Sequence, residues 1–286
     1  MQLAARQNLA RPCVLVFAGH DPSGGAGIAA DIEAIAAQGA HALTVITTLT
    51  VQDHNQVFNV YPVDIQIVRE QTHCLIAGLK IAAIKIGLLG SIQMAEEIVR
   101  LIAEVKEKNG DIPVVLDPVL SSGRGNALGV DDAVGAVLHV LPYATLLTPN
   151  LPEMNRLYSA LVGESDGLTK RPDLALSPAQ ILLRGACTHV LLKGGHADEA
   201  GVVNRWFQSA VMDKETAWNW RRLPDEFHGS GCTLASAIAA LLALGKTMEA
   251  SLTEAQQYTQ STLAASYFIG DGQRIPQRLL TTQVQK

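Results

Sequence analysis

The sequence predicts an α/β fold with a mainly parallel β-sheet that is covered by helices on both faces. Short, uniformly apolar runs rich in β-branched residues alternate with alanine-rich segments of helical periodicity along almost the whole chain. Apolar strands separated by helices are typical of a parallel sheet buried between two helical layers. With 286 residues, of which 48% are hydrophobic, the chain is long enough to bury a large core.

The expected strands and helices alternate in chain order. We expect buried strands at residues 13–19, 42–50, 81–87, 113–117, 145–149 and 189–195. We expect helices at residues 27–38, 64–77, 92–108, 131–140, 151–161 and 178–187, and a further small-residue helix that begins near residue 232. Their lengths and alternation favour βαβ units over a sandwich or a bundle.

Three segments depart from this alternation. Residues 57–63 form a short β-like piece between a strand and a helix, which we interpret as a small flap. Residues 202–222 carry alternating and aromatic residues, which predict an antiparallel hairpin at a sheet edge. Residues 163–177 are polar and predict a surface loop.

The composition points to one domain that handles small molecules. No repeat or linker divides residues 1–286, and we expect only residues 1–11 and 277–286 to be loosely ordered. The net charge is −5 and no basic stripe or like-charge run is present, so we expect no nucleic-acid partner and no anionic membrane surface.

Cysteine usage and hydropathy favour a cytoplasmic protein. Cys13, Cys74, Cys187 and Cys232 are far apart and form no CxxC pair, so neither a disulfide framework nor a zinc cluster is expected. The first dozen residues lack the apolar core of a signal peptide. The apolar stretches are interrupted before they reach the length that spans a bilayer.

The segment FHGSGCTLASAIAALLALG, at residues 227–245, is the most informative part of the chain. Gly229, Ser230 and Gly231 lead directly into the helix that begins near Cys232. Glycines let several backbone N–H groups turn toward one point, and the positive end of the helix dipole adds to them. Such a nest binds an anion, most often phosphate. The alternative is a plain loop-to-helix junction in which the glycines only make the turn.

Polar or glycine-rich clusters follow six of the expected strands. They occupy residues 19–27, 50–53, 85–87, 117–119, 148–153 and 193–196. Each cluster taken alone is better explained as a turn at a strand end. However, ligands of open parallel sheets bind beyond the carboxyl ends of the strands, where all six clusters would meet.

These clusters contain the groups that phosphoryl transfer requires. Lys193 follows an apolar strand and suits a point charge held against phosphates. Asp117, Asn150 and Glu153 offer oxygen ligands for Mg²⁺, directly or through water. For Glu153 the alternative is a helix N-terminal carboxylate that only favours the dipole. Together with the nest, these residues predict magnesium-dependent phosphoryl transfer.

Seven motifs in this order resemble one known family. They are AGHDPSGGAG at residues 18–27, LTVQD at 49–53, KIG at 85–87, LDPV at 116–119, TPNLPE at 148–153, LLKGGH at 191–196 and HGSGCT at 228–233. The chain resembles the hydroxymethylpyrimidine/phosphomethylpyrimidine kinases of thiamine biosynthesis, within the ribokinase-like superfamily. The resemblance extends from about residue 13 to about residue 275. It implies a three-layer sandwich, ATP and Mg²⁺ as co-substrate and cofactor, and two successive phosphorylations of 4-amino-5-hydroxymethyl-2-methylpyrimidine.

The resemblance also implies a role for each motif residue. The pyrimidine would contact Gln52, Asp21 and Leu88, and the backbone at Gly19, Ala26 and Val119. ATP would contact Lys193, Asn150, Thr148 and Gly195, while Glu153 and Asp117 would organise Mg²⁺. The catalytic group would comprise Cys232, Gly229, Ser230, Gly231 and Lys193.

Cys232 stands where most of the superfamily has an aspartate general base. A thiol at a helix N-terminus is expected to lose its proton more easily than a free thiol, so Cys232 is a candidate proton acceptor. The alternative is a packed cysteine without a chemical role. His20 and Asp53 depart from the residues usual in the family, and Arg124 is a candidate for holding a substrate phosphate.

Other functions remain open on the sequence alone. A pyridoxal or pyridoxine kinase on the same scaffold is the nearest alternative, since pyridoxal is also an aromatic ring with a hydroxymethyl group. A carbohydrate or nucleoside kinase is disfavoured by Cys232. A catalytically silent pyrimidine-binding protein is the alternative from another class. The resemblance further implies a homodimer, with the flap at residues 57–63 helping to cover a site.

Overall fold

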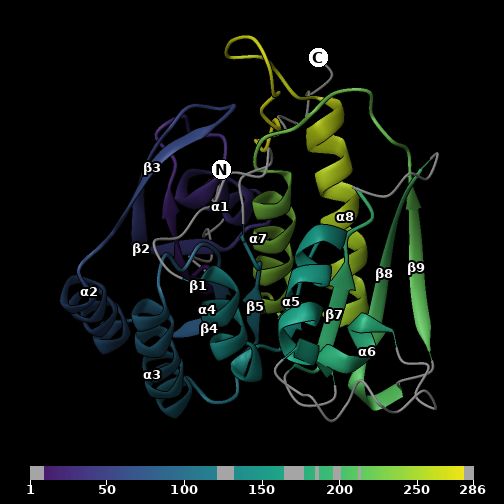
Figure 1. Cartoon of the computed structure of the whole chain (residues 1–286). Helices are drawn as coiled ribbons and strands as arrows, with labels where there is room; N and C mark the ends of the chain where they lie inside the picture. Colours follow the sequence, from purple (N-terminus) through teal and green to yellow (C-terminus); the bar gives the residue numbers. More distant parts are fainter. Residues whose placement is uncertain are drawn as a thin grey trace, which may run out of the picture.

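The expected strands assemble into one nine-stranded sheet with the order β3-β2-β1-β4-β5-β6-β7-β8-β9 (Figure 1). The computed structural model describes residues 10–120, 132–163, 177–183, 187–195, 201–211 and 214–279. The strands are β1 Cys13–His20, β2 His41–Gln52, β3 Val57–Pro62, β4 Ile81–Ile86, β5 Val114–Leu116, β6 Leu146–Leu147, β7 His189–Leu192, β8 Val202–Gln208 and β9 Glu215–Trp220. The helices are α1 Gly27–Ala37, α2 Ile65–Gly78, α3 Ile92–Asn109, α4 Ala133–Val140, α5 Leu151–Gly163, α6 Pro178–Leu183, α7 Ser230–Ala243 and α8 Met248–Ala264, with short 3-10 turns η1 Leu141–Tyr143 and η2 Ser209–Val211.

The central strands are parallel and the edges are antiparallel. Strands β2, β1, β4, β5, β6 and β7 pair in parallel, as the apolar runs predicted. At one edge β3 pairs antiparallel with β2, which confirms a β-strand in the expected flap. At the other edge β8 and β9 form the expected antiparallel hairpin, and β8 pairs with β7. The parallel centre therefore places six carboxyl strand ends along one edge of the sheet.

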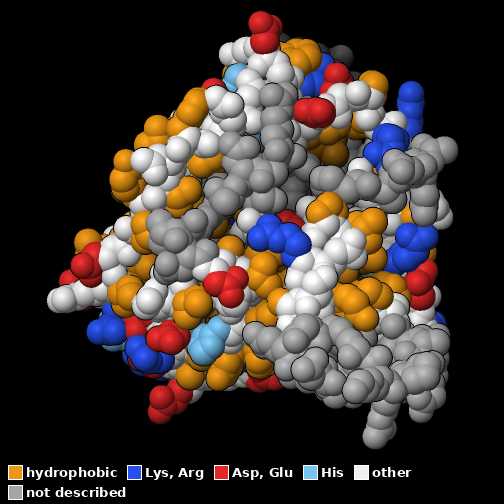
Figure 2. Space-filling view, viewed as in Figure 1, with side chains coloured by type: hydrophobic (Ala, Val, Ile, Leu, Met, Phe, Trp, Pro, Cys, Tyr) orange, Lys and Arg blue, Asp and Glu red, His pale blue; other side chains and the backbone are white. Residues whose placement is uncertain are grey.

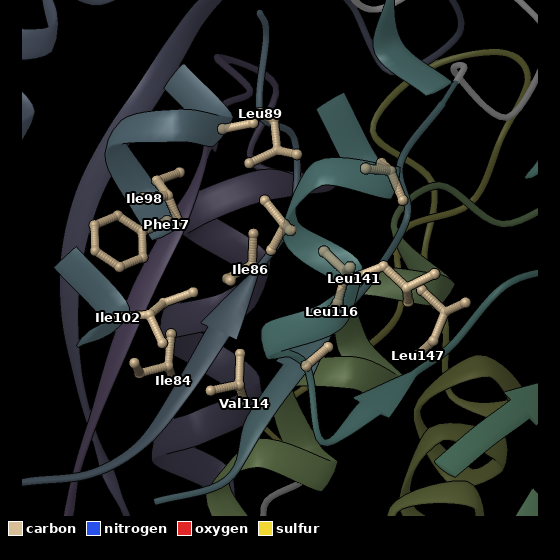
Figure 3. Packing of buried hydrophobic residues seen from close by; sticks show 14 of the residues in the cluster. Phe17, Ile84, Ile86, Leu89, Ile98, Ile102, Val114, Leu116, Leu141 and Leu147 are labelled. Atoms are coloured by element: carbon tan, nitrogen blue, oxygen red, sulfur yellow. The ribbon is translucent and has the colours of Figure 1, made fainter. Parts of the chain in front are cut away.

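Alternate residues of each central strand pack against the two helical layers. On β1, Leu15 and Phe17 point into the core shared with α2, α3 and α4, whereas Val14 and Val16 point toward α1, α7 and α8. Figure 3 shows the first of these cores, where strand residues such as Phe17 meet Ile98 and Ile102 of α3. Each fully buried Leu, Ile or Phe contributes about 1.5–3 kcal/mol of transfer free energy. The two cores fix the sheet as a rigid base for the residues at its carboxyl edge.

Helix α8 was not predicted from the sequence. Its buried face includes Ser251, Gln256, Thr259 and Thr262 rather than a stripe of large apolar residues. The hydroxyl of Thr259 donates to the carbonyl of Ala255, 2.8 Å away, and the amide of Gln256 donates to the carbonyl of Leu252. The hydroxyl of Ser251 has no hydrogen-bond partner among the described residues. Because hydrophobic periodicity is the main signal for a helix, a buried helical face made of Ser, Thr and Gln escapes detection.

Some expectations differ from the structure or fall outside it. Helix α7 begins at Ser230, two residues earlier than expected, and α6 ends at Leu183 before three residues that are not described. Residues 164–176 of the expected surface loop, Arg124 and His196 also lie outside the described residues. No helix in the described part of the chain is both long and apolar enough to cross a membrane.

Candidate active site

A cavity of about 580 Å³ lies at the carboxyl edge of the sheet. All of the predicted site residues except Thr148 line it: Gly19, Asp21, Ala26, Gln52, Leu88, Asp117, Val119, Asn150, Glu153, Lys193, Gly195, Gly229, Ser230, Gly231 and Cys232. Thr148 is fully buried and donates from Oγ1 to Oδ1 of Asp117 at 3.2 Å, so it supports a lining residue. The convergence expected from the strand ends is therefore present in the folded chain.

The anion nest, which we define as residues 229–232, starts with a glycine in the left-handed region. Gly229 has a φ of 77° and precedes the first residue of α7. Its carbonyl accepts hydrogen bonds from the backbone N–H of Thr233 at 3.0 Å and from its hydroxyl at 2.8 Å. A side chain at Gly229 would collide with the carbonyl oxygen of Gly25. Glycine is therefore required here both by φ and by space, and the N–H groups of the first helical turn have no acceptor within the helix.

Lys193 and Asp117 lie directly beside this nest. The Nζ atom of Lys193 is 3.0 Å from Oδ1 of Asp117. A Cβ atom placed on Gly231 would lie 3.1 Å from that Nζ atom and 3.7 Å from Oδ2 of Asp117. Burial disfavours the ammonium, but Asp117 and Glu153 outweigh it and raise the pKa of Lys193, so the side chain carries its charge. The cavity thus holds a fixed positive charge next to a ring of backbone donors.

Asn150 and Glu153 form a reciprocal capping box at the start of α5. Oε2 of Glu153 accepts from the backbone N–H of Asn150, and Oδ1 of Asn150 accepts from the backbone N–H of Glu153, both at 2.8 Å. The structural alternative for Glu153 is therefore present, although both residues also line the cavity. Burial, reinforced by the charge of Asp117, raises the pKa of Glu153 to about 7.

The donor set fits Mg²⁺ held mainly through water. Within the described ranges no three His, Cys, Asp or Glu side chains cluster closely enough to hold a metal alone. Asp117 and Glu153 are the carboxylates that line the cavity beside Lys193. Mg²⁺ retains several waters and commonly takes only one or two protein carboxylates together with substrate phosphates. Two carboxylates beside an anion nest match this mode of binding.

Cys232 lies in the first turn of α7, partly exposed to the cavity. The structure contradicts the expectation that its helix position makes the thiol more acidic. Burial raises the pKa of Cys232 to about 11; the charge of Lys85 lowers this pKa, whereas the charges of Asp117 and Asp31 raise it further. Desolvation in a cavity with two neighbouring carboxylates outweighs the helix dipole.

A fully buried ion pair that the sequence did not reveal lies on the α1/α7 face of β4. The Nζ atom of Lys85 is 2.9 Å from both carboxylate oxygens of Asp31, and all of these side chains are inaccessible to solvent. Ser236, one turn after Cys232 on α7, donates to Oδ1 of Asp31 at 2.6 Å. Burial disfavours the ammonium, but the charge and hydrogen bond of Asp31 and the other acidic groups nearby together outweigh burial and raise the pKa of Lys85. The pair joins β4, α1 and α7 beneath the anion nest.

Asp21 organises residues 21–27, which we call the substrate loop because the family resemblance predicts that they contact the substrate. Its two oxygens accept from the backbone N–H groups of Ser23 and Ala26, both at 2.8 Å. Oδ2 also lies 2.7 Å from Nε2 of His228, the residue before the nest. Burial would raise the pKa of Asp21, but the hydrogen bonds from His228 and Ser23 outweigh it, and the net shift is downward. His228 is a cavity residue that was missed as a partner of Asp21, because 207 residues separate the two in the chain.

The far wall beside the loop is formed by Gln52, Thr50 and Leu88. The amide of Gln52 donates to the hydroxyl of Thr50 at 2.7 Å, and that hydroxyl donates to the carbonyl of His20 at 2.8 Å. Leu88 approaches Gly19 so closely that a Cβ atom there would lie 2.9 Å from its Cδ2 atom. These residues form a mixed polar and apolar surface, which is the kind of wall that a small aromatic ring binds against.

Asp53 and the side chain of His20, the two departures from the family pattern, do not line the cavity formed by the described residues. Oδ1 of Asp53 accepts from the backbone N–H groups of Asn55 and Gln56, at 2.7 and 2.9 Å. It therefore closes the turn between β2 and β3.

A second end of the cavity is lined by residues that sequence reasoning did not select. They include Asn204, Trp220, Arg222, Leu223, Gln256 and Leu263. Gln256 of α8 accepts from Asn204 at 2.8 Å and from the indole of Trp220 at 2.9 Å. Asn204 in turn accepts from the backbone N–H of Gly194 at 2.9 Å. This network ties the strand end that carries Lys193 to the edge hairpin and to α8.

The topology and the site define a ribokinase-like kinase fold. A pyridoxal kinase from Staphylococcus aureus, solved in complex with AMP-PCP and pyridoxal, superposes with a TM-score of 0.78 at 24% identity and covers 96% of each chain. The match shows a shared architecture.

The sequence comparisons identify the family. The phosphomethylpyrimidine kinase family model matches residues 21–277. The hydroxymethylpyrimidine/phosphomethylpyrimidine kinase of Streptomyces coelicolor is 33% identical over 91% of this chain and 92% of its own length. The thiamine biosynthesis bifunctional protein of Geobacter sulfurreducens is 33% identical over 92% of this chain, which spans about half (51%) of that protein. The chain therefore belongs to the phosphomethylpyrimidine kinase family.

Proposed function

We propose that the protein uses ATP to phosphorylate 4-amino-5-hydroxymethyl-2-methylpyrimidine, first to the monophosphate and then to the diphosphate, in thiamine biosynthesis. One observation carries the proposal. The anion nest, Lys193 and Asp117 meet within one cavity whose neighbouring wall is formed by the substrate loop and Gln52. A ring site beside a site for transferred phosphate is the arrangement that a small-molecule kinase requires. The family membership supports the same assignment.

The pyrimidine would occupy the wall formed by Gln52, Leu88 and the substrate loop. The amide of Gln52 both donates and accepts, which suits the exocyclic amine and ring nitrogen of an aminopyrimidine. Leu88 covers the ring with an apolar surface. The Asp21 hydrogen bonds hold the loop in shape before the substrate arrives, so that little ordering is left for the binding step.

The phosphates of ATP would lie between Lys193 and the anion nest. There the ammonium and the N–H groups of the first turn of α7 would stabilise the charge that spreads over the transferred phosphoryl group. Asn150, Thr148 and Gly195 would complete the binding of ATP. Asp117 and Glu153 would hold Mg²⁺, which neutralises phosphate charge when it is bound.

Cys232 would position the hydroxymethyl group of the substrate rather than act as the base that removes the proton of that group. With a thiol pKa of about 11, the side chain is protonated at neutral pH. In a loose transition state the new bond is barely formed, so a strong base contributes little and alignment contributes most. The second phosphorylation depends even less on a base, because the accepting phosphate oxygen is already anionic.

Product mass spectrometry tests the proposal. The protein would be incubated with ATP, Mg²⁺ and the hydroxymethylpyrimidine, and in a parallel tube with pyridoxal. A pyrimidine diphosphate is expected, with its monophosphate appearing first. If the monophosphate accumulates and no diphosphate forms, the protein does not catalyse the second phosphorylation. If ligand binds but no product forms, the protein is a catalytically silent binding protein.

Pyridoxal phosphorylation is the second candidate, favoured by the fold match to a pyridoxal kinase. The cavity is large enough for either ring. Pyridoxal phosphate as the only product would transfer the assignment to this activity.

A homodimer and a cytoplasmic location complete the proposal. Leu49, Val51, Phe58 and Tyr61 of β2 and β3 are about half exposed or more, and Figure 2 shows hydrophobic side chains along this edge. An exposed apolar group of this kind marks an association surface, and a second copy of the chain is the partner we expect. All four cysteines are free, as is usual in a reducing compartment. Sedimentation of the wild type and of Phe58→Ser would test the dimer.

A further inference from the structure

Arg278 is a fully buried charged residue that the proposed mechanism does not use. Its side chain is 1% exposed although it lies within the C-terminal range expected to be loosely ordered. It does not line the cavity, and it falls one residue beyond the segment matched by the family model. A buried guanidinium requires several partners, so its position is informative about what it holds.

The guanidinium contacts three separate parts of the fold. Its Nε atom donates to Oγ1 of Thr233 on α7 at 2.8 Å. One terminal nitrogen is 3.1 Å from Oε2 of Glu33 on α1. The other donates to the backbone carbonyl of Gly25 in the substrate loop. The planar fork of arginine is suited to holding such partners in fixed relative positions.

Two of these contacts lead to the two halves of the site. The hydroxyl of Thr233 donates a hydrogen bond to the carbonyl of Gly229, 2.8 Å away, at the start of the anion nest. Gly25 lies in the middle of the substrate loop, and its carbonyl oxygen also packs against the Cα atom of Gly229. The loop and the nest therefore meet at Gly25 and Gly229, where Arg278 bonds the loop directly and reaches the nest through Thr233. The Asp21–His228 contact is a second link between the two segments.

We propose that Arg278 is a positioning residue that locks the substrate loop against the anion nest, and so sets the distance between the ring and the transferred phosphate. The kinetic part of this proposal rests on the proposed function, whereas the structural part does not. Phosphoryl transfer depends mainly on alignment, and a misplacement of about 1 Å can cost on the order of 100-fold in rate. Loss of the fork leaves the Asp21–His228 contact in place but removes the link at Gly25 and Thr233, so the loop can shift relative to the nest.

The decisive variant is Arg278→Gln, followed by hydrogen exchange and steady-state kinetics. Faster exchange is expected in both residues 21–27 and residues 228–233, together with a fall of about 10- to 100-fold in kcat/KM for the pyrimidine in both phosphorylation steps. The fall should appear mainly in kcat. Unchanged exchange in either segment, or unchanged kinetics well below the unfolding temperature, would overturn the proposal and leave Arg278 a stabilising residue only.

Two matched variants separate this role from loss of charge or of packing. Glu33→Gln removes the ion pair but leaves the contacts to Gly25 and Thr233, and should keep wild-type kinetics. Arg274→Gln removes an arginine from the same segment whose side chain bonds Ser266 and stacks on Phe268, 4.3 Å from its ring centroid. It should also keep wild-type kinetics. Loss of activity in both controls equal to that in Arg278→Gln would refute a specific role.

A second measurement covers the case in which Arg278→Gln folds poorly. Arg278→Lys keeps a buried cation but not the fork, and should show faster exchange in both segments while remaining folded. Arg278→Ala should regain activity when guanidinium is added at low millimolar concentration, and should not respond to sodium at the same ionic strength. No rescue, combined with native exchange in the lysine variant, would contradict the proposal. If the wild-type protein makes no pyrimidine phosphate, the proposed function fails. The exchange experiment still tests whether Arg278 locks the substrate loop against the anion nest.

Discussion

The Nζ atom of Lys193 lies 3.0 Å from Oδ1 of Asp117 at the carboxyl edge of the sheet. The two residues are 76 positions apart in the chain and come from the ends of β7 and β5. Their side chains are largely buried, and both lie within reach of the anion nest. The pair holds a cation and a carboxylate at one point of the cavity, and in the proposed function the cation would contact phosphate and the carboxylate would hold Mg²⁺.

Lys193→Met should lower kcat/KM for ATP by about 100- to 1,000-fold, the range for removal of one group that stabilises transition-state charge. The variant also leaves Asp117 without its cation beside the phosphates, so like charges repel. Steady-state kinetics with saturating pyrimidine would measure the effect. Lys246→Met provides the matched control, because Lys246 pairs with Glu254 on the surface of the protein. Equal activity of Lys193→Met and Lys246→Met would show that Lys193 does not contribute to phosphate binding.

Asp21→Asn should destabilise the protein in a pH-dependent way. The hydrogen bonds to Asp21 lower its pKa in the folded state, so its contribution is complete above the unfolded pKa of about 3.9 and is lost as the pH falls through the folded value. The free energy of unfolding should drop by about 1–3 kcal/mol at pH 7 in the variant. The difference in the free energy of unfolding between the wild type and the variant should become smaller in acid.

Urea denaturation at pH 7 and in steps below pH 4 measures this gap. Asp111→Asn is the control, since the side chain of Asp111 is almost fully exposed and pairs with Lys106 at the surface. A constant difference between wild type and Asp21→Asn across the acid range would show that the loop does not depend on the Asp21 charge.

Much of the site was predictable because a parallel sheet gathers its carboxyl strand ends in one place. Asp117 and Lys193 were found from that rule together with their residue types. Partners that lie far apart in the chain left no local pattern. Arg278 meets Gly25 across 253 positions, and Lys85 meets Asp31 across 54. Such pairs appear only when the helices have been placed against the sheet.

The acidity of Cys232 shows a second limit of sequence reasoning. Its position at a helix N-terminus was correct, yet the inferred shift of its pKa had the wrong sign. The dipole acts locally and is visible in sequence, whereas burial and the charges of Asp117 and Asp31 come from the tertiary structure. The larger effect on the pKa of Cys232 therefore comes from the tertiary structure, which the local sequence does not reveal.

Alkylation of Cys232 by iodoacetamide should follow a thiol pKa of about 11. The thiolate is the reactive species, so the rate should be very low at pH 7 and should still be rising at pH 10. Peptide mass spectrometry of the folded protein would follow this site and the exposed Cys74 in one experiment. Cys232→Ser provides the background. Faster modification of Cys232 than of Cys74 at pH 7 would show an activated thiol and restore the interpretation of Cys232 as a base.

The Lys85–Asp31 pair should show strong energetic coupling, because both side chains are completely buried. Lys85→Met leaves the Asp31 carboxylate without its cation and should lower the free energy of unfolding by about 3–5 kcal/mol. Asp31→Asn added to it removes the stranded charge and keeps an acceptor for Ser236, so the double variant should be more stable than the sum of the single effects predicts.

A double-mutant cycle by chemical denaturation measures this coupling, and the exposed pair Lys106–Asp111 gives the matched cycle with the same substitutions. Exposed pairs contribute about 0–1 kcal/mol, so the coupling energy of the buried Lys85–Asp31 pair should be clearly larger than that of Lys106–Asp111. Equal coupling in both cycles would mean that water reaches Lys85 and that the space beneath the anion nest is not sealed. In that case the surroundings that raise the pKa of Cys232 would also be wetter than its burial indicates, and the thiol would titrate closer to its ordinary value.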